Sequence, residues 1–417
     1  MRKIIIFLKF ILRSKFIFKT PEKCDLVVFD EKSIIDLNIC VSKFNFFILQ
    51  TRLEKPIDVT PLSKFQQVPK IYFSYKILKK ILKNCFKGNL FTIYLVSLIE
   101  LINPKVVITT IDRSFKFSDV AKILDEKINF FAIQNSMTHD LSNWKYLYET
   151  KKIKKNLIKK LYIPNLFCIG DYDKVTWKKF GVNVKNFFPI GNLRLANFFY
   201  HIKAEKNSPE KYKSDICLVA EHSIHSNIIQ SKLNESKRNE GLVKLIRYTV
   251  KFCLKHKKKL IIPLKTDKKY HPNSPKLEIE HFERNFKGEE LNYIKKCFLE
   301  RDRDDFSSQR ALLNSEVTVS AMSTMLRHKL ATGGKILSCN LTKIDRYNFP
   351  VNGICTLNNC SYDEFEKRLL EIYSISKKDY FSRIEDDPDY FEKYTKNYST
   401  INFIREKLSQ LGVRQNS

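Results

Sequence analysis

A serine-threonine pair in the second half of the chain lies where a phosphate group could bind. Ser323 and Thr324 follow a short β-branched run, Val317–Val319, and precede apolar residues at helical spacing. This order predicts a buried strand, a helix that begins at the two hydroxyls, and a stop at Gly333-Gly334. The backbone N–H groups of a helix start at the carboxyl end of a parallel strand favour phosphate. An ordinary capped helix in an α/β domain is the alternative interpretation.

Three acidic residues follow predicted strands closely, in positions where a carboxylate could act as a base or a nucleophile. They are Asp112 after the strand 105–110, Glu221 after the strand 215–220, and Asp267 after the strand 260–263. A carboxylate in such a position can take a proton from an acceptor hydroxyl or attack a sugar. Each of the three could instead be a solvated loop charge or a helix cap.

Polar residues at the ends of other predicted strands are candidates for binding an acceptor. Gln134 and Asn135 follow the strand 129–133, and their amides can hydrogen-bond a sugar or a base. A simple turn is the alternative there, because Asn and Ser are common turn residues. Arg194, near the end of the first half of the chain, could reach an anionic ligand, although an arginine in a linker is usually solvated.

Two residues of the second half are further candidates for the donor side. Lys265 follows the strand 260–263 and could neutralise a leaving phosphate, and Ser223 could face the ligand. His222 and His225 have the HxxH spacing of some zinc sites, but no third ligand follows at helical spacing. We therefore expect neither a metal ion nor a cofactor. Neither a P-loop nor a GxGxxG fingerprint occurs in the sequence.

The hydrophobic pattern around these residues predicts two domains of alternating strands and helices. Apolar runs alternate with amphipathic segments on both sides of a polar stretch, 191–214. Such alternation predicts an α/β chain of two doubly wound parallel sheets that face a cleft, the GT-B plan. The expected parts are an amphipathic N-terminal helix (1–20), a Rossmann-like acceptor domain (21–195), a linker (196–214), a Rossmann-like nucleotide-sugar domain (215–360) and C-terminal helices (361–417) that pack back on the first domain. We also expect one long amphipathic segment (75–102) and an irregular loop (267–288).

Composition limits the partners of this 417-residue chain. Its 75 Lys and Arg residues against 45 Asp and Glu give a net charge of +30, which implies nucleic acid, an anionic membrane face or a phosphorylated substrate as partner. The charge is spread along the chain without an RNP or helix-turn-helix motif, which disfavours nucleic acid. The ten cysteines are scattered without a CxxC pair, as expected for reduced thiols of a cytoplasmic protein.

The first residues combine basic and apolar side chains. Met1–Phe18 begins like a signal peptide, but Lys9 and Arg13 interrupt the apolar run and no small-residue cleavage site follows. The segment is also too short and too charged to span a bilayer. On a helical wheel Arg2, Lys9 and Arg13 share a narrow sector, which predicts either a helix in the membrane interface or a first core helix. Peripheral association with the inner face of the cytoplasmic membrane is therefore one expectation.

Short segments in the same order along nearly the whole chain resemble bacterial surface-carbohydrate biosynthesis proteins, the GT-B glycosyltransferases of capsule and O-antigen assembly. The segments are DLVVFD (25–30), NPKVVITTIDRSFKF (103–117), FFAIQNS (130–136), FCIGDY with FPIGNLR (167–194), ICLVAEHS (216–223), SEVTVSAMSTM (315–325) and FPVNGICTL (349–357). The chain is similar in particular to retaining Kdo transferases. The resemblance implies a GT-B fold and a nucleotide-sugar donor such as CMP-Kdo.

The resemblance also implies roles for individual residues. Ser323 and Thr324 would hold the donor phosphate, while Asp112 and Gln134 would face the acceptor. Family members commonly continue the Ser-Thr pair with a leucine, a small residue, an aromatic residue and a nucleotide-binding Glu. This chain lacks that Glu and has Arg327 and His328 in the same run. Arg327 or His328 then serves the nucleotide, or the donor differs, or the protein is inactive.

The sequence thus predicts a metal-independent glycosyltransferase of surface polysaccharide (capsule or lipopolysaccharide) biosynthesis. It would move a sugar from a nucleotide donor to a lipid-linked or growing glycan. A catalytically degenerate GT-B scaffold of a glycan assembly complex is one alternative. Another GT-B chemistry, such as glycerophosphotransfer or sugar epimerisation, is a second.

Overall fold

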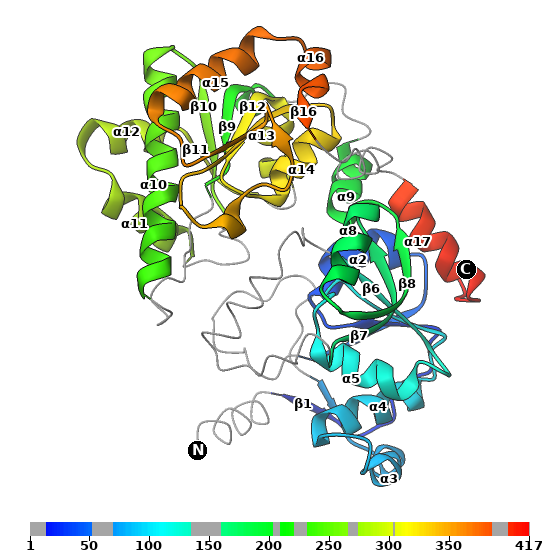
Figure 1. Cartoon of the computed structure of the whole chain (residues 1–417). Coiled ribbons are helices and arrows are strands. Elements are labelled where there is room, and N and C mark those ends of the chain that lie inside the picture. Colours follow the sequence, from blue (N-terminus) through cyan, green and yellow to red (C-terminus); the bar gives the residue numbers. More distant parts are fainter. Residues whose placement is uncertain are drawn as a thin grey trace. The chain divides into compact units, whose positions relative to one another are not determined.

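The chain forms two compact units in a computed structural model that describes residues 14–51, 70–134, 160–202, 209–220, 232–265, 274–302, 305–385 and 399–416 (Figure 1). Unit 1 comprises Met1–Ser136, Lys155–Tyr200 and Lys396–Ser417, and unit 2 comprises Met137–Lys154 and His201–Thr395. None of the helices in the described ranges is both long enough and apolar enough to cross a membrane.

Unit 1 is built on a parallel six-stranded sheet with the order β3-β2-β5-β6-β7-β8. Its strands are β2 (Leu26–Phe29), β3 (Phe46–Leu49), β5 (Val106–Thr109), β6 (Asn129–Ile133), β7 (Tyr162–Cys168) and β8 (Asn183–Pro189). Its helices are α2 (Ser33–Val41), α3 (Tyr75–Asn84), α4 (Leu90–Ile102), α5 (Phe115–Leu124), α8 (Asp171–Lys179), α9 (Leu193–Ile202) and α17 (Ser399–Gln410). A separate parallel ribbon joins β1 (Lys15–Ile17) to β4 (Lys70–Tyr72). The central strands are apolar runs because both faces of the sheet are covered.

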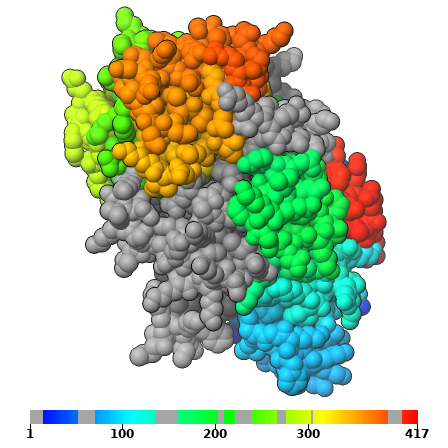
Figure 2. Space-filling model, in the orientation of Figure 1, coloured from blue at the N-terminus to red at the C-terminus, as the bar shows by residue number. Residues whose placement is uncertain are grey.

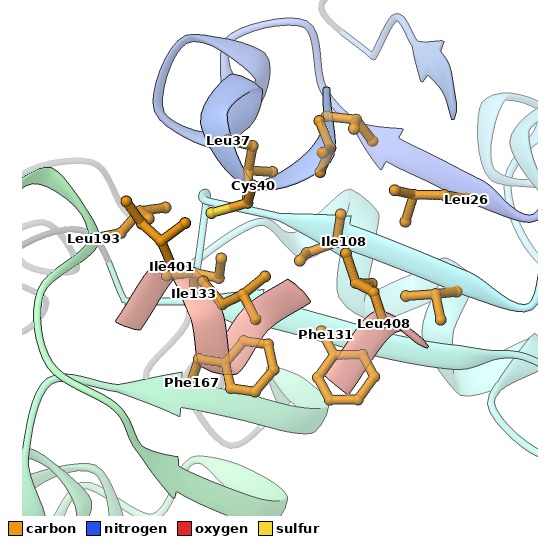
Figure 3. Close-up of a cluster of buried hydrophobic side chains, with 14 of the residues drawn as sticks. Leu26, Leu37, Cys40, Ile108, Phe131, Ile133, Phe167, Leu193, Ile401 and Leu408 are labelled. Carbon is orange, nitrogen blue, oxygen red and sulfur yellow. The ribbon is translucent and has the colours of Figure 1, made fainter. Parts of the chain in front are cut away.

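The C-terminal helix α17 completes the core of unit 1. Ile401, Ile404 and Leu408 are buried against side chains of the sheet such as Ile108 and Phe131 (Figure 3). The Thr400 hydroxyl donates a hydrogen bond to the carbonyl of Ile190. The last segment of the chain therefore packs back on the first unit, as predicted.

Unit 2 has a parallel six-stranded sheet with the order β11-β10-β9-β12-β13-β15. Its strands are β9 (Ser214–Leu218), β10 (Leu260–Pro263), β11 (Phe298–Leu299), β12 (Ser315–Ser320), β13 (Lys335–Asn340) and β15 (Thr356–Asn358). Its helices are α10 (Lys232–Lys255), α11 (Ser274–Asn285), α12 (Gly288–Lys296), α13 (Ser307–Asn314), α14 (Thr324–Ala331), α15 (Tyr362–Ser374) and α16 (Lys377–Ser382), and β14 (Asn352–Gly353) pairs antiparallel with β16 (Ile384–Glu385). Numbered along the chain, this strand order is 3-2-1-4-5-6, that of Rossmann folds.

The prediction of two doubly wound parallel sheets is confirmed, but three local expectations are wrong. Residues 15–17 form a strand and not the end of a helix, because they pair with residues 70–72. The expected linker (196–214) begins inside helix α9, which starts at residue 193, where the side chain of Asn192 accepts a hydrogen bond from the backbone N–H of Leu195 at 3.0 Å. The expected loop 267–288 contains α11, which starts at a Ser-Pro pair typical of helix starts.

Two further elements differ in extent from the sequence interpretation. The amphipathic segment 75–102 is divided into α3 and α4, since the side chain of Asn89 accepts from the backbone N–H of Thr92 at 3.0 Å and starts a new helix. Of the expected C-terminal helices, α15 packs on α10 within unit 2, so only α17 of these two returns to unit 1. Residues 1–13, which make up most of the expected N-terminal helix, lie outside the described part.

Candidate functional site

The connection from β12 to α14 starts a helix with a serine cap. Ser323 has extended backbone angles, φ −146° and ψ 145°, and its Oγ accepts from the backbone N–H of Met325 at 3.3 Å. Its carbonyl accepts from the backbone N–H of Leu326 at 3.0 Å. Thr324 is the first helical residue, so both hydroxyls lie at the positive end of the helix dipole. The predicted strand, cap and helix are confirmed, and the helix stops at Gly333, where φ is +72°.

The start of α14 coincides with the point at which the strand order of unit 2 reverses. β9 and β12 are neighbours at the centre of the sheet, and the chain builds outward from this pair on both sides. Their carboxyl ends are joined by two hydrogen bonds: Val219 N–H to the Val319 carbonyl at 2.9 Å, and the Ser320 hydroxyl to the Val219 carbonyl at 2.9 Å. In open α/β sheets, ligands bind beside the strand ends at such a reversal.

Lys265 lies at the same edge of this sheet. It follows β10, and β9 separates β10 from β12, so the strand ends are about 10 Å apart at the usual interstrand spacing. Its backbone N–H donates to Glu278 Oε1 at 2.8 Å, and its carbonyl accepts from Arg301, while its side chain is exposed. The backbone of Lys265 is thus fixed at the edge of the sheet that carries Ser323.

From Leu326 onward the residues of α14 are buried, which the sequence did not indicate. Arg327 and His328, expected to serve the nucleotide, are 1% and 3% exposed, and Lys329 is also 3% exposed. The Lys329 ammonium donates to the carbonyls of Leu312 (2.8 Å), Leu313 (3.2 Å) and Ser315 (2.6 Å). It therefore caps the C-terminus of α13, and burial lowers the pKa of Lys329 to about 8.

Asp112 lies at the carboxyl edge of the unit 1 sheet, beyond β5, and is 8% exposed. It does not cap the next helix, because Ser114 is the N-cap of α5 and its Oγ accepts from the backbone N–H of Phe117 at 3.2 Å. The strand order of unit 1 reverses between β2 and β5, so Asp112 follows one of the two strands at this reversal.

Asp30 follows β2, the other strand at this reversal, and was not among the candidates predicted from the sequence. Asp30 is 5% exposed and has a φ of 80°, a left-handed conformation that is uncommon outside glycine. Its Oδ2 accepts from the Thr51 hydroxyl at 2.8 Å and its Oδ1 from the backbone N–H of Lys32 at 3.0 Å. The only signal for it in the sequence is an aspartate that directly ends an apolar run.

Two residues expected to bind the acceptor make hydrogen bonds within unit 1. The Gln134 Nε2 donates to Asp173 Oδ1 at 2.7 Å, and its Oε1 accepts from the backbone N–H of Ile169 at 3.3 Å. Gln134 is 1% exposed, so this amide joins β6 to β7 and α8 inside the fold. Arg194 donates from Nε and Nη2 to Asp36 at 3.2–3.3 Å, which ties α9 to α2. Both side chains that we expected to bind the acceptor therefore make hydrogen bonds to other residues of unit 1.

The remaining predicted site residues, Asn135, Glu221, Ser223 and Asp267, lie outside the described part of the chain. Within the described residues no three His, Cys, Asp or Glu side chains are grouped so that they could hold a metal ion. A cavity of about 250 Å³ in unit 1 lies between the edge strand β3 and β4, with Tyr94 and Leu98 in its wall, and none of the predicted site residues lines it.

Solved structures of similar fold cover almost the whole chain. A structure described as a UDP-N-acetylglucosamine 2-epimerase from Listeria monocytogenes matches with a TM-score of 0.51 at 11% identity, over 95% of this chain and 99% of that one. The Methanocaldococcus jannaschii UDP-GlcNAc 2-epimerase bound to UDP-GlcNAc and UDP has a TM-score of 0.49 at 12% identity, over 92% and 99%. A trehalose 6-phosphate synthase from Burkholderia multivorans has a TM-score of 0.45 at 10% identity, over 94% and 98%.

The sequence itself matches no protein-family model and no curated protein. The likeness to the Listeria structure extends over both units and agrees with the two parallel six-stranded sheets described above. The chain therefore has a GT-B-like fold of two Rossmann-like units.

Proposed function

We propose that this chain is an enzyme that acts on a nucleotide-activated sugar, with the donor phosphates at the start of α14. The observation that carries the proposal is that the Ser323 helix start coincides with the strand-order reversal of unit 2. Backbone N–H groups, two hydroxyls and the positive helix end all favour phosphate oxygens there. Lys265, at the same sheet edge, adds a positive charge without a metal ion.

Two reactions are candidates for this site. Epimerisation of the bound sugar is supported by the Listeria structure of similar fold, which is described as a UDP-N-acetylglucosamine 2-epimerase. Transfer of the sugar, with CMP-Kdo as one possible donor, to a lipid-linked or surface glycan is supported by the segments that resemble Kdo transferases. Either reaction needs a group that moves a proton. Asp112 is the candidate in the described chain, and Asp267 and Glu221 are the others.

Nucleotide binding is tested by titrating the full chain with UDP, CMP and UDP-GlcNAc in a calorimeter. Ser323→Ala should weaken binding about tenfold or more, because it removes a hydroxyl from a site for a charged ligand. Ser361→Ala is the matched control: Ser361 also caps a helix of unit 2, with its Oγ accepting from Glu364 N–H at 3.2 Å. Both variants should lose about 1 kcal/mol of stability, but only Ser323→Ala should lose affinity. The proposal fails if no nucleotide binds or if the two variants bind alike.

The reaction is tested by incubating the chain with UDP-GlcNAc, and separately with CMP-Kdo and glycan acceptors, and following the products by NMR. A new epimer formed without an acceptor identifies epimerisation, whereas nucleotide release that depends on an acceptor identifies transfer. Asp112→Asn should lower the rate about 100-fold and leave nucleotide affinity unchanged if Asp112 moves the proton. Binding of a nucleotide without conversion of any donor would instead support the degenerate scaffold.

A further inference from the structure

Exposed apolar side chains gather on one part of unit 1. Of the thirteen large hydrophobic side chains that are exposed in the described chain, eight lie in or next to β1, β4, α3 and the turn into α4. They are Phe16, Phe18, Phe73, Tyr75, Leu78, Leu82, Phe86 and Leu90, and the most exposed is Phe86 at 98%. In Figure 2 the residues of α3 and α4 are the light-blue atoms at the lower edge of the view. A patch of this kind marks an interaction surface.

The aromatic part of this patch is continuous from the β1–β4 ribbon into α3. The ring centroids of Phe16 and Phe18 are 6.3 Å apart, and those of Phe18 and Phe73 are 6.2 Å apart. The backbone N–H of Phe73 donates to the Ile17 carbonyl at 2.9 Å, which holds the two strands together. Ser74 follows Phe73 directly and caps α3. The rings and the helix therefore form one surface.

Helix α3 has three faces. Ile77 and Asn84 are buried against α4, and Asn84 Nδ2 donates to Glu100 Oε2 at 3.1 Å. At 3.6 residues per turn, Tyr75, Leu78 and Leu82 lie on a second face within about 60° of one another. Three lysines occupy the third face within about another 60°: Lys76, Lys79 and Lys83. The outer side of α3 is thus half apolar and half cationic.

The charged side chains of α3 itself are all positive, and the Glu100 carboxylate that reaches this helix is paired with Lys80 at 3.1 Å. No Asp or Glu occurs between residues 70 and 90, and Lys76, Lys79 and Lys83 form no ion pair with any residue of the described ranges. Interfaces between proteins are depleted in lysine, whereas apolar side chains flanked by lysines suit an anionic bilayer, where the rings enter the headgroup region and the ammonium groups meet lipid phosphates.

We propose that the α3 surface, defined as Phe73, Tyr75, Leu78, Leu82 and Phe86 with Lys76, Lys79 and Lys83, docks onto an anionic membrane. The contact goes beyond the proposed sugar-nucleotide activity and does not depend on it. It also differs from the membrane contact expected from residues 1–18, because all of its side chains lie between residues 73 and 86 and its three lysines are on α3.

The lysines are tested by cosedimentation of the full chain with phosphatidylcholine vesicles, with and without 30% phosphatidylglycerol. The wild type should bind only the anionic vesicles, and added salt should weaken binding. Lys76→Gln/Lys79→Gln/Lys83→Gln should weaken it on the order of 100-fold. The control Lys367→Gln/Lys377→Gln/Lys378→Gln removes the same charge from exposed lysines of unit 2 and should bind like the wild type. Equal losses in both variants would mean that net charge alone drives binding and would overturn the proposal.

The apolar face is tested with Leu82→Ser/Phe86→Ser, which should weaken vesicle binding at least tenfold. Leu254→Ser/Leu370→Ser changes two exposed leucines of unit 2 and should have no effect. Circular dichroism checks that both variants stay folded. A wild type that does not bind anionic vesicles overturns the proposal. So does a Leu82/Phe86 variant that keeps vesicle binding but loses self-association in the ultracentrifuge, because the surface would then bind a second copy of the chain.

Discussion

The side chain of Lys329 fills the space that a Cβ at Gly334 would need. A Cβ added at Gly334 would lie 2.3 Å from Lys329 Cε and 2.5 Å from its Cδ. Lysine chains usually yield to such a contact, but this one is held by three carbonyls at the end of α13. The glycine that follows α14 and the buried lysine within α14 therefore depend on each other.

Gly334→Ala should destabilise the fold by about 2 kcal/mol or more, because Lys329 must give up hydrogen bonds to buried carbonyls. In a Lys329→Ala background the space is open, and the same change should cost less than about 0.5 kcal/mol. Urea unfolding of the four proteins of this double-mutant cycle measures the coupling. Equal costs of Gly334→Ala in both backgrounds would show that the contact does not couple the two residues.

The lowered pKa of Lys329 should make stability rise with pH. Burial lowers the pKa of Lys329 from 10.5 to about 8 in the folded chain. Between pH 8 and pH 10.5 the unfolded chain therefore binds one more proton than the folded chain. Because the unfolded state binds more protons, the free energy of unfolding increases with pH in this range. Below pH 8 the group is protonated in both states and contributes no slope. The stability difference between wild type and Lys329→Met should therefore grow by up to about 3 kcal/mol between pH 7 and pH 10.5. A constant difference in urea unfolding across this range would contradict the prediction.

Asp30 offers a separate test at the strand-order reversal of unit 1. Asp30→Ala should cost about 2–3 kcal/mol, since it removes both acceptors and places alanine at a φ of 80°. Asp30→Asn should cost less than about 1 kcal/mol, because asparagine tolerates this backbone conformation and its amide can still bond Thr51 and Lys32. Urea midpoints of the two variants decide the matter. An Asn variant as unstable as the Ala variant would mean that the carboxylate charge itself is required.

The sequence was informative where structure is local. Apolar runs predicted the bounds of β6 and β10, because strands covered on both faces need continuous apolar residues. The cap at Ser323 and the stop at Gly333 follow from backbone chemistry within a few residues.

What depends on distant partners could not be read from the sequence. The pairing of β1 with β4 joins residues 55 positions apart, so 15–17 resembled a helix by local pattern. From the sequence alone, Lys329 resembles a surface lysine, and only the structure shows that it binds carbonyls at the end of α13. Similarly, Gln134 resembles a ligand-binding residue, and only the structure shows its hydrogen bond to Asp173. Likewise, only the strand order shows that Ser323 lies at a reversal, which is the main support for the proposed site.

Gly241 gives a final prediction in which the usual effect of a mutation should change sign. Replacing a helical glycine with alanine normally stabilises a helix by about 1 kcal/mol. In α10, however, a Cβ at Gly241 would lie 2.5 Å from backbone atoms of Leu341 and Thr342, which cannot move without shifting the end of β13. Gly241→Ala should therefore destabilise the fold by about 3 kcal/mol or more. Gly88→Ala is the control, because its Cβ would meet only the Thr92 side chain, at 3.3 Å. If Gly241→Ala raised the urea midpoint, this close approach of α10 to the backbone after β13 would be wrong.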